Sequence, residues 1–230
     1  MPQKSAEIMS ALYETYGARL EALGFKPNKA RSLYKRKSKT ALSELEFNFA
    51  GRSDGLHLIF SHTDPAAAKL HKQAENAVRL GEGQAPHNFP RPTLCITDWK
   101  YLLTLYGRDY KELTGWFTSV PDTVRLHEKT RAAYSFIIGE ILPDLLKRFD
   151  TADGLENLLW QTAEDGFYGD SFDRYHAANL LCLGLAKGQN GLEENRRRIL
   201  AMPCYASPHT DQEGIGRFYR ALENLPAESA

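Results

Sequence analysis

Seven histidines are the first residues in this sequence that could do chemistry, because imidazole nitrogens bind metal ions and transfer protons near neutral pH. They stand at positions 57, 62, 71, 87, 127, 176 and 209. No pair has the HxH, HxxxH or HExxH spacing of metal ligands, and the fourth residue after His127 is Arg131. His57 and His62 lie an odd number of residues apart on one predicted strand, so they point to opposite faces. The sequence therefore predicts no metal site.

Nucleophilic catalysis and nucleotide binding each need a local motif, and the sequence has neither. No serine stands in a GxSxG turn, and the two glycines of GEGQAP lack both the GxGxxG spacing and a phosphate-binding lysine. Cys182 lies within the apolar stretch ANLLCLGLA, which predicts a buried, unreactive thiol. We expect no catalytic residue and no cofactor. A small-molecule enzyme with a pocket that the sequence does not reveal stays an alternative.

The three cysteines, Cys95, Cys182 and Cys204, are odd in number and far apart. This arrangement is typical of free thiols in a reducing compartment, so we expect no disulfide and a cytoplasmic location. No apolar run is long enough to span a bilayer, and the first residues do not resemble a signal peptide. Membrane partners are therefore not expected.

The net charge of zero hides two segregated runs of charge. Between Glu21 and Glu44 lie seven cations and no acid: Lys26, Lys29, Arg31, Lys35, Arg36, Lys37 and Lys39. Between Arg148 and Arg174 lie seven acids and no cation: Asp150, Asp153, Glu156, Glu164, Asp165, Asp170 and Asp173. Because the whole chain has no general attraction to nucleic acid, electrostatic binding would have to come from one of these runs.

The acidic run is interleaved with aromatic residues, a combination typical of protein-binding surfaces. Aromatic side chains supply contact area, and acidic side chains steer a basic partner toward the site. If the aromatics are exposed, we predict a partner site formed by Trp160, Glu164, Asp165, Phe167, Tyr168, Asp170, Phe172 and Asp173. The structural alternative is a connection between helices, in which the aromatic side chains are buried. The acidic side chains would then stabilise the N-terminal ends of the helices.

The basic run indicates a second kind of partner. A cationic strand with an exposed tyrosine can hold single-stranded nucleic acid by phosphate contacts and base stacking. This alternative uses Lys29, Arg31, Tyr34, Lys35, Arg36 and Lys37. The structural alternative is an edge strand whose lysines prevent aggregation, and the two charged runs could also pair with each other.

The stretch SELEFNFAGRSDGLHLIFSHTD, residues 43–64, predicts a β-hairpin, because apolar residues alternate on both sides of Asp54-Gly55. These two residues suit a two-residue type I′ turn. Such a turn would place Phe49 opposite Phe60, with both apolar rows on one buried face.

Helical spacing of apolar residues predicts most of the other elements. A first helix over 5–23 has Ser5 as its N-cap and Gly24 after its end, and a second over 65–80 begins after Asp64. A short strand is expected at TLCIT, and the next residues, 98–107, fit a strand or a helix. Further helices are expected over 153–164, 171–187, 192–201 and 211–224.

Two further predictions concern a kink and an N-cap in the helices. Pro143 lies inside a predicted helix over 122–149, and we expect a kink there because its ring obstructs the carbonyl group of Gly139. Asp170 or Ser171 could cap the helix over 171–187.

Strands in the first half and helices in the second predict an α+β fold. We expect an N-terminal helix and a small antiparallel sheet, followed by a C-terminal bundle of antiparallel helices. The predicted regions are 1–120 and 121–230, and the second could pack as one domain with the first.

The order of a helix, LGFK, LYKRK and FNFAGR resembles that of certain small bacterial proteins of unknown function. Those proteins begin with a helix that ends in a similar Leu-Gly-Phe and continue into an antiparallel sheet. The resemblance covers about the first quarter of the chain and implies no activity. We therefore expect a non-enzymatic bacterial protein that binds another protein, such as an immunity or accessory protein that occludes a basic partner.

Overall fold

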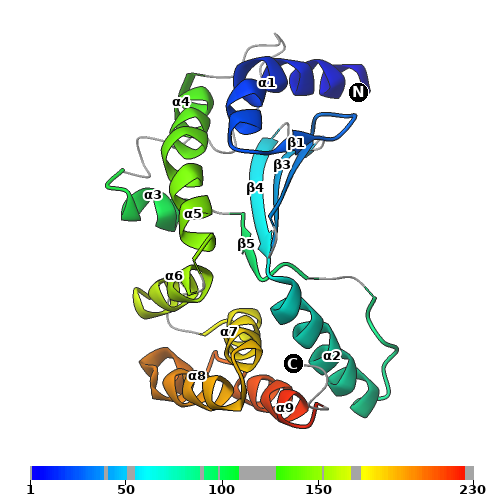
Figure 1. Cartoon of the computed structure of the whole chain (residues 1–230), viewed down its shortest axis with the longest axis vertical. Helices are drawn as coiled ribbons and strands as arrows, with labels where there is room; N and C mark the ends of the chain where they lie inside the picture. The colour runs from blue at the N-terminus through cyan, green and yellow to red at the C-terminus, as the bar shows by residue number, and fades with distance from the viewer. Residues whose placement is uncertain are drawn as a thin grey trace. The chain divides into compact units, whose positions relative to one another are not determined.

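The computed structural model describes residues 2–38, 41–50, 55–88, 91–97, 99–108, 128–151, 153–166 and 172–225. A helix precedes a five-stranded sheet and further helices follow, so the predicted α+β fold is confirmed (Figure 1). The strands are β1 (Lys26–Pro27), β2 (Leu33–Lys37), β3 (Leu42–Ala50), β4 (Gly55–Thr63) and β5 (Leu94–Ile96). The helices are α1 (Pro2–Ala22), α2 (Pro65–Gly81), α3 (Lys100–Leu105), α4 (Glu128–Phe136), η2 (Ile137–Ile141), α5 (Leu142–Phe149), α6 (Gly154–Glu164), α7 (Arg174–Ala186), α8 (Gln189–Ala201), η3 (Pro203–Ala206) and α9 (Gln212–Glu223).

The chain forms two compact units, and each is made of two separate segments. The first unit contains residues 1–62 and 95–151, and the second contains residues 63–94 and 152–230. This division differs from the predicted boundary between residues 120 and 121. The physical reason is packing, because α4 and α5 contact aromatic residues of the sheet, whereas α2 packs against α7 and α9.

The predicted hairpin of β3 and β4 exists, but Gly55, one of the two residues of the predicted turn, belongs to a strand. Gly55 is already the first residue of β4, and β3 ends at Ala50. The four residues between these strand ends, 51–54, lie outside the described residues. A buried hydrogen bond of 2.9 Å joins the hydroxyl group of Ser43 and Nδ1 of His62, which makes these two residues cross-strand neighbours.

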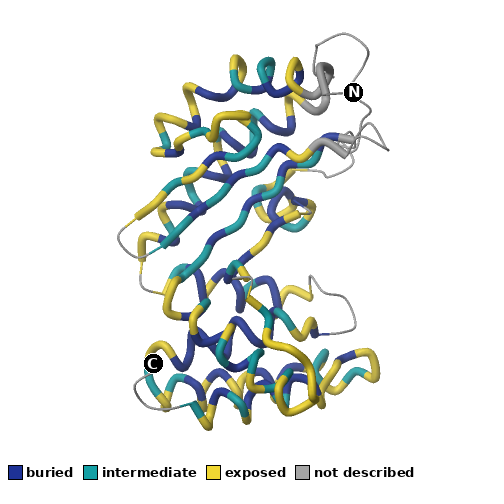
Figure 2. Tube along the Cα trace, turned by 90° about the vertical axis from the view of Figure 1, so that its right-hand side faces the viewer, coloured by how far each residue is buried: buried dark blue, intermediate teal, exposed yellow. Residues whose placement is uncertain are grey.

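The strand ends and this hydrogen bond agree on one register, in which Ser43 lies opposite His62. In this register Phe49 lies opposite Leu56, four residues away from the predicted partner Phe60. The predicted pairing of Phe49 with Phe60 is therefore wrong. Because four is even, the offset does not exchange the two faces of the strands. Burial alternates along β4 as predicted (Figure 2), and its buried residues are Leu56, Leu58, Phe60 and His62.

Aromatic side chains fill the buried face of the sheet. Tyr16 of α1 and Tyr134 of α4 pack on Phe47, with ring centroids 6.3 and 6.0 Å away. Farther along, Phe149 of α5 stacks on Phe60 at 6.2 Å. Helices α1, α4 and α5 thus cover one face of the sheet with a continuous apolar layer.

Two buried side chains donate hydrogen bonds to backbone carbonyl groups of β4. The neighbouring strand β5 has only three residues, so it cannot pair with the whole length of β4. The indole N–H of Trp99 donates to the carbonyl oxygen of Leu58 at 2.8 Å, and the Tyr134 hydroxyl donates to that of Leu56 at 3.0 Å. These side chains act as the donors that a longer strand would supply.

Helix α5 follows α4 (Figure 1), and the π-helical turn η2 joins them at the place where the sequence predicts a kink. The N–H of Leu142 donates to the carbonyl oxygen of Ile137, five residues back. Pro143 has no N–H, and in a regular α-helix its ring would meet the carbonyl group of Gly139. The wider π turn accommodates the proline without ending the helix.

Acidic residues cap the helices of the second unit. Asp64 accepts a hydrogen bond of 2.8 Å from the backbone N–H of Ala67, which confirms the predicted start of α2. The caps predicted for α7, Asp170 and Ser171, lie outside the described residues. That prediction is wrong, because α7 begins at Arg174 and Asp173 caps it.

Helix α1 also begins earlier than predicted. It starts at Pro2, so Ser5 lies within the helix and is not its N-cap. The predicted end is confirmed, because Gly24 follows the helix with a φ of 85°, a left-handed conformation that glycine adopts without strain.

Helix α7 lies at the centre of the second unit. All ten of its residues from 176 to 185 are buried, and it contacts α2, α6, α8 and α9. Cys182 is among the buried residues, as predicted, and burial raises the pKa of its thiol. The thiol is therefore protonated and shielded from solvent.

Replacing Tyr134 by Phe should lower the free energy of unfolding by about 1–3 kcal/mol, because the buried carbonyl group of Leu56 loses its donor. Tyr13→Phe is the matched control, since the Tyr13 hydroxyl bonds the exposed carboxylate of Glu21. Urea unfolding of both variants measures the difference. Equal stability of Tyr134→Phe and the unmodified chain would show that this hydrogen bond does not support β4.

Candidate functional site

The aromatic residues of the predicted partner site are placed differently from the prediction. Trp160 and Phe172 are 2% and 1% exposed, so the expected exposure is wrong for both. Phe172 is held in the core, where its ring packs edge-on against His176. Phe167 and Tyr168 lie outside the described residues, as does Asp170, and their role stays a prediction.

The acidic residues of this segment have more than one role. Asp173 is exposed but accepts hydrogen bonds from the first backbone N–H groups of α7, so it is a helix cap. Glu164 forms an ion pair with Arg198, whose guanidinium group lies 4.1 Å above the ring of Trp160. Asp165 is exposed at the end of α6. Asp173 therefore has a structural role. Glu164 and Asp165 are exposed acids of the segment that do not cap a helix.

A groove of about 700 Å³ lies beside these two acids, between α6, α8 and η3. We call it the α6–α8 groove. Glu164 and Arg198 are polar residues of its wall. The other residues that line it are Ala163, Gly166, Ala201, Met202, Pro203, Cys204 and Ser207. Such a mainly apolar depression has room for a large apolar side chain of a ligand together with its neighbours.

The predicted nucleic-acid strand lacks its stacking residue. Tyr34 is fully buried, it packs edge-on against Phe47, and burial raises the pKa of its hydroxyl to about 12. Lys35 pairs with Glu44 of β3 at 2.6 Å, a contact that suits a structural strand. The expected stacking by Tyr34 is therefore wrong.

The remaining described cations of the basic run lie at the surface, but not together. Arg36 pairs with Asp150 at 3.5 Å, so one member of the basic run meets one member of the acidic run. Lys37 is exposed. Lys29 and Arg31 line a polar depression of about 540 Å³, and the guanidinium group of Arg31 stacks on a tyrosine ring. The basic run is not brought together on one strand face.

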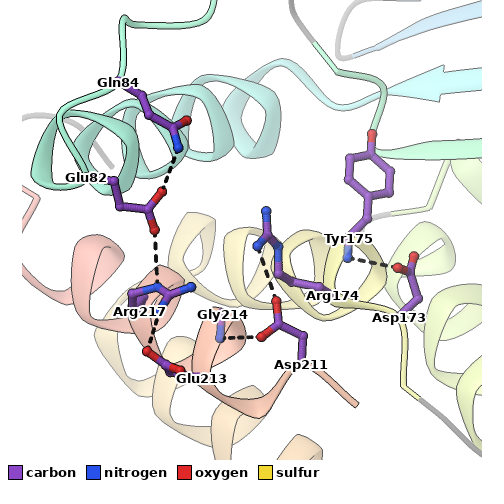
Figure 3. A network of polar contacts seen from close by, with 9 residues as sticks. All are labelled: Glu82, Gln84, Asp173, Arg174, Tyr175, Asp211, Glu213, Gly214 and Arg217. Atoms are coloured by element: carbon purple, nitrogen blue, oxygen red, sulfur yellow. Dashed lines mark hydrogen bonds and ion pairs between the residues drawn. The ribbon is translucent and has the colours of Figure 1, made fainter. Parts of the chain in front are cut away.

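The sequence did not reveal a polar network between the end of α2 and the starts of α7 and α9 (Figure 3). Arg217 of α9 pairs with Glu82 beyond α2 at 3.5 Å and also with Glu213. Arg174 of α7 pairs with Asp211, the cap of α9, at 3.2 Å. These pairs join three helices that are far apart in the sequence, so the network is a connection within the second unit.

His71 lies buried beside this network. Its ring packs between Tyr175 and Phe218, with centroids 5.5 and 5.0 Å away, and its Nδ1 is 3.8 Å from the carboxylate of Glu75. Glu75 also pairs with Arg91 at 3.0 Å. The spacing of four residues between His71 and Glu75 within a predicted helix is the signal that could have revealed this pair.

The buried His71 ring is suited to remain neutral. Burial lowers its pKa to about 4, because a charged imidazolium would lose its hydration. Its Nε2 has no hydrogen-bond partner among the described residues. No group of three or more metal-binding side chains occurs in the described part of the chain. The arrangement therefore supports packing rather than proton transfer to a substrate.

Comparisons with protein-family models, curated proteins and solved structures find no match to this chain. None of the described helices has the length and apolar character needed to cross a membrane. The inference of function therefore rests on the grooves and charges of the two units.

Acid should destabilise the second unit through two buried histidines. Burial lowers the pKa of both His71 and His176 from 6.5 to about 4, so below pH 6.5 the unfolded chain binds protons that the folded chain does not. The free energy of unfolding should therefore fall between pH 6.5 and 4, by up to about 1.4 kcal/mol per pH unit for each histidine. Urea unfolding at a series of pH values measures this slope.

The variant His71→Leu removes one of the two buried imidazoles, together with the Nε2 that has no partner. It should reduce the slope by about half over the same pH range. A slope that His71→Leu leaves unchanged would contradict the burial of a neutral imidazole at this position.

Proposed function

We propose that this chain is a protein-binding module, and that the α6–α8 groove receives an apolar side chain of its partner. The observation that carries this proposal is the position of the groove, whose apolar lining directly adjoins the surface acids Glu164 and Asp165. An apolar anchor with charged surroundings is the usual form of a strong contact point in a protein interface.

The charge of the second unit supports a basic partner. Its sequence contains 15 acidic and 11 basic residues, so its net charge is −4, whereas the first unit has 14 acidic and 18 basic residues. A negative surface attracts a basic protein and speeds its association. The proposed role is that of an immunity or accessory protein in the cytoplasm that occludes such a partner, and the three free thiols favour this location.

The size of the groove limits what it can do alone. A stable interface buries roughly 800 Å² on each partner, which is more than one side chain in a groove can cover. The groove is therefore an anchor point, and surrounding surface must contribute the rest of the contact. This gives the acids a separate role, because rim charges mainly change association rates and anchor residues mainly change dissociation rates.

Selection of a random peptide library on the immobilised chain tests the proposal without requiring the natural partner. We expect enriched peptides to share one large apolar residue flanked by Lys or Arg. Ala201→Trp, which fills the groove from an exposed position, should weaken binding of an enriched peptide at least about tenfold. Enrichment of acidic peptides, or of peptides that bind Ala201→Trp equally well, would contradict the proposal.

Charge reversal at the rim gives a second test with a matched control. Asp165→Lys should slow association of an enriched basic peptide several-fold at low salt and weaken its salt dependence. Glu194→Lys makes the same charge change at an exposed position of α8 that does not line the groove. Stopped-flow or biosensor kinetics at two salt concentrations compares them, and equal effects would show that the position of the acid is irrelevant.

A further inference from the structure

A second cleft, of about 380 Å³, lies between α8 and α9 on the second unit, and we call it the α8–α9 cleft. Buried side chains of Leu181, Ile199 and Ile215 line it. Tyr205 and Tyr219 add two aromatic rings. The cleft thus combines an apolar part with polar side chains at its edge, as sites for small organic molecules do.

Two arginines give this cleft a defined chemistry. No carboxylate pairs with the side chain of Arg220 within the described part of the chain. Arg196 is 3.8 Å from Glu193, and its guanidinium group is stacked 4.1 Å from the centre of the Tyr219 ring. A guanidinium group binds a carboxylate through two parallel hydrogen bonds, so Arg220 is the available anchor for an acid.

Gly216 supplies an independent observation. It lies within α9 and lines the cleft, and a Cβ atom there would meet only the Arg220 side chain, at an ordinary contact distance of 3.6 Å. By contrast, a Cβ atom at Gly184 would lie 2.6 Å from the carbonyl oxygen of Gly191, so that glycine is required for packing. Glycine destabilises a helix relative to alanine. Neither close packing nor a positive φ requires a glycine at position 216. The lack of a side chain there leaves space beside Arg220.

We propose that the α8–α9 cleft binds a small monocarboxylic acid with an aromatic or branched aliphatic body. Arg220 would bind the carboxylate, and the apolar lining would hold the body. Glu223 lies one turn beyond Arg220 and also lines the cleft, with its carboxylate 3.3 Å from the Tyr219 hydroxyl, which also donates to Glu193. Its negative charge repels a carboxylate at that end of the cleft, so the acid group is placed at Arg220.

The probe for this site is 3-phenylpropionate. The control compound is 3-phenylpropionamide, which has the same body but no charge. Titrations followed by NMR or calorimetry should show saturable binding of the acid at millimolar concentration or below, and binding of the amide at least about tenfold weaker. Absence of saturable binding of the acid, or equal affinity for acid and amide, would overturn the proposal.

Three variants locate the binding on the protein. Arg220→Gln should weaken binding of the acid about tenfold and leave binding of the amide unchanged, because only the charged contact is lost. Arg197→Gln removes the same charge from an exposed position outside the cleft and should change the affinity less than twofold. Gly216→Leu should abolish binding of both compounds by filling the space beside Arg220. Equal losses in Arg220→Gln and Arg197→Gln would overturn the assignment.

The substitution Gly216→Ala tests whether the fold itself requires this glycine. Alanine should raise the folding equilibrium constant by about fivefold, because it favours the helix and meets no close contact. A decrease in stability, measured by urea unfolding, would mean that Gly216 is required for the fold and does not mark a ligand site.

Discussion

Helix α7 imposes the constraint on which the second unit depends, because it has no exposed face between residues 176 and 185. Its residues from 176 to 185 are all buried, so neighbours must cover it on every side. A surface helix needs cover on one stripe only, whereas a helix that is apolar all round must become the centre of a core. The covering helices are α2, α6, α8 and α9, and α2 comes from a distant part of the sequence. This requirement explains why the second unit is built from two separate segments of the chain.

Two polar side chains within this core form hydrogen bonds with neighbouring helices. The imidazole Nε2 of His176 donates to the carbonyl oxygen of Leu159 in α6 at 2.7 Å. Asn195 of α8 donates to the carbonyl oxygen of Leu180 at 2.7 Å and to the carboxylate of Glu156 at 2.6 Å. These contacts fix α8 against α7 and α6. Helix α8 in turn borders both the α6–α8 groove and the α8–α9 cleft, so the central packing determines the shape of both proposed sites.

The sequence predicted those features that depend on local spacing. The cap at Asp64, the burial of Cys182 and the alternation along β4 each follow from residues close together in the chain, and each is confirmed. The hairpin register failed because Asp54-Gly55 suits a tight turn, whereas a register four residues away buries the same face. The choice between such registers depends on contacts such as that of Ser43 with His62, which no local pattern contains.

The candidate site was harder to predict, because composition does not show which side chains are covered. Trp160 was expected at the surface, but it is buried beneath the guanidinium group of Arg198, which is 38 positions later in the sequence. The α6–α8 groove and the α8–α9 cleft likewise form only where distant helices meet. Of the surface acids expected near the partner site, Glu164 and Asp165 were identified from the sequence, whereas the groove beside them was not.

Helix α2 folds with the C-terminal helices around α7, although it directly follows β4 in the sequence. Native-state hydrogen exchange in increasing denaturant tests this directly, because amides of one cooperative unit share one free energy of opening. We expect the buried amides of α2, such as that of Leu70, to open together with those of α7 and α9. An opening of α2 that instead follows β4, with α7 retaining its protection, would contradict it.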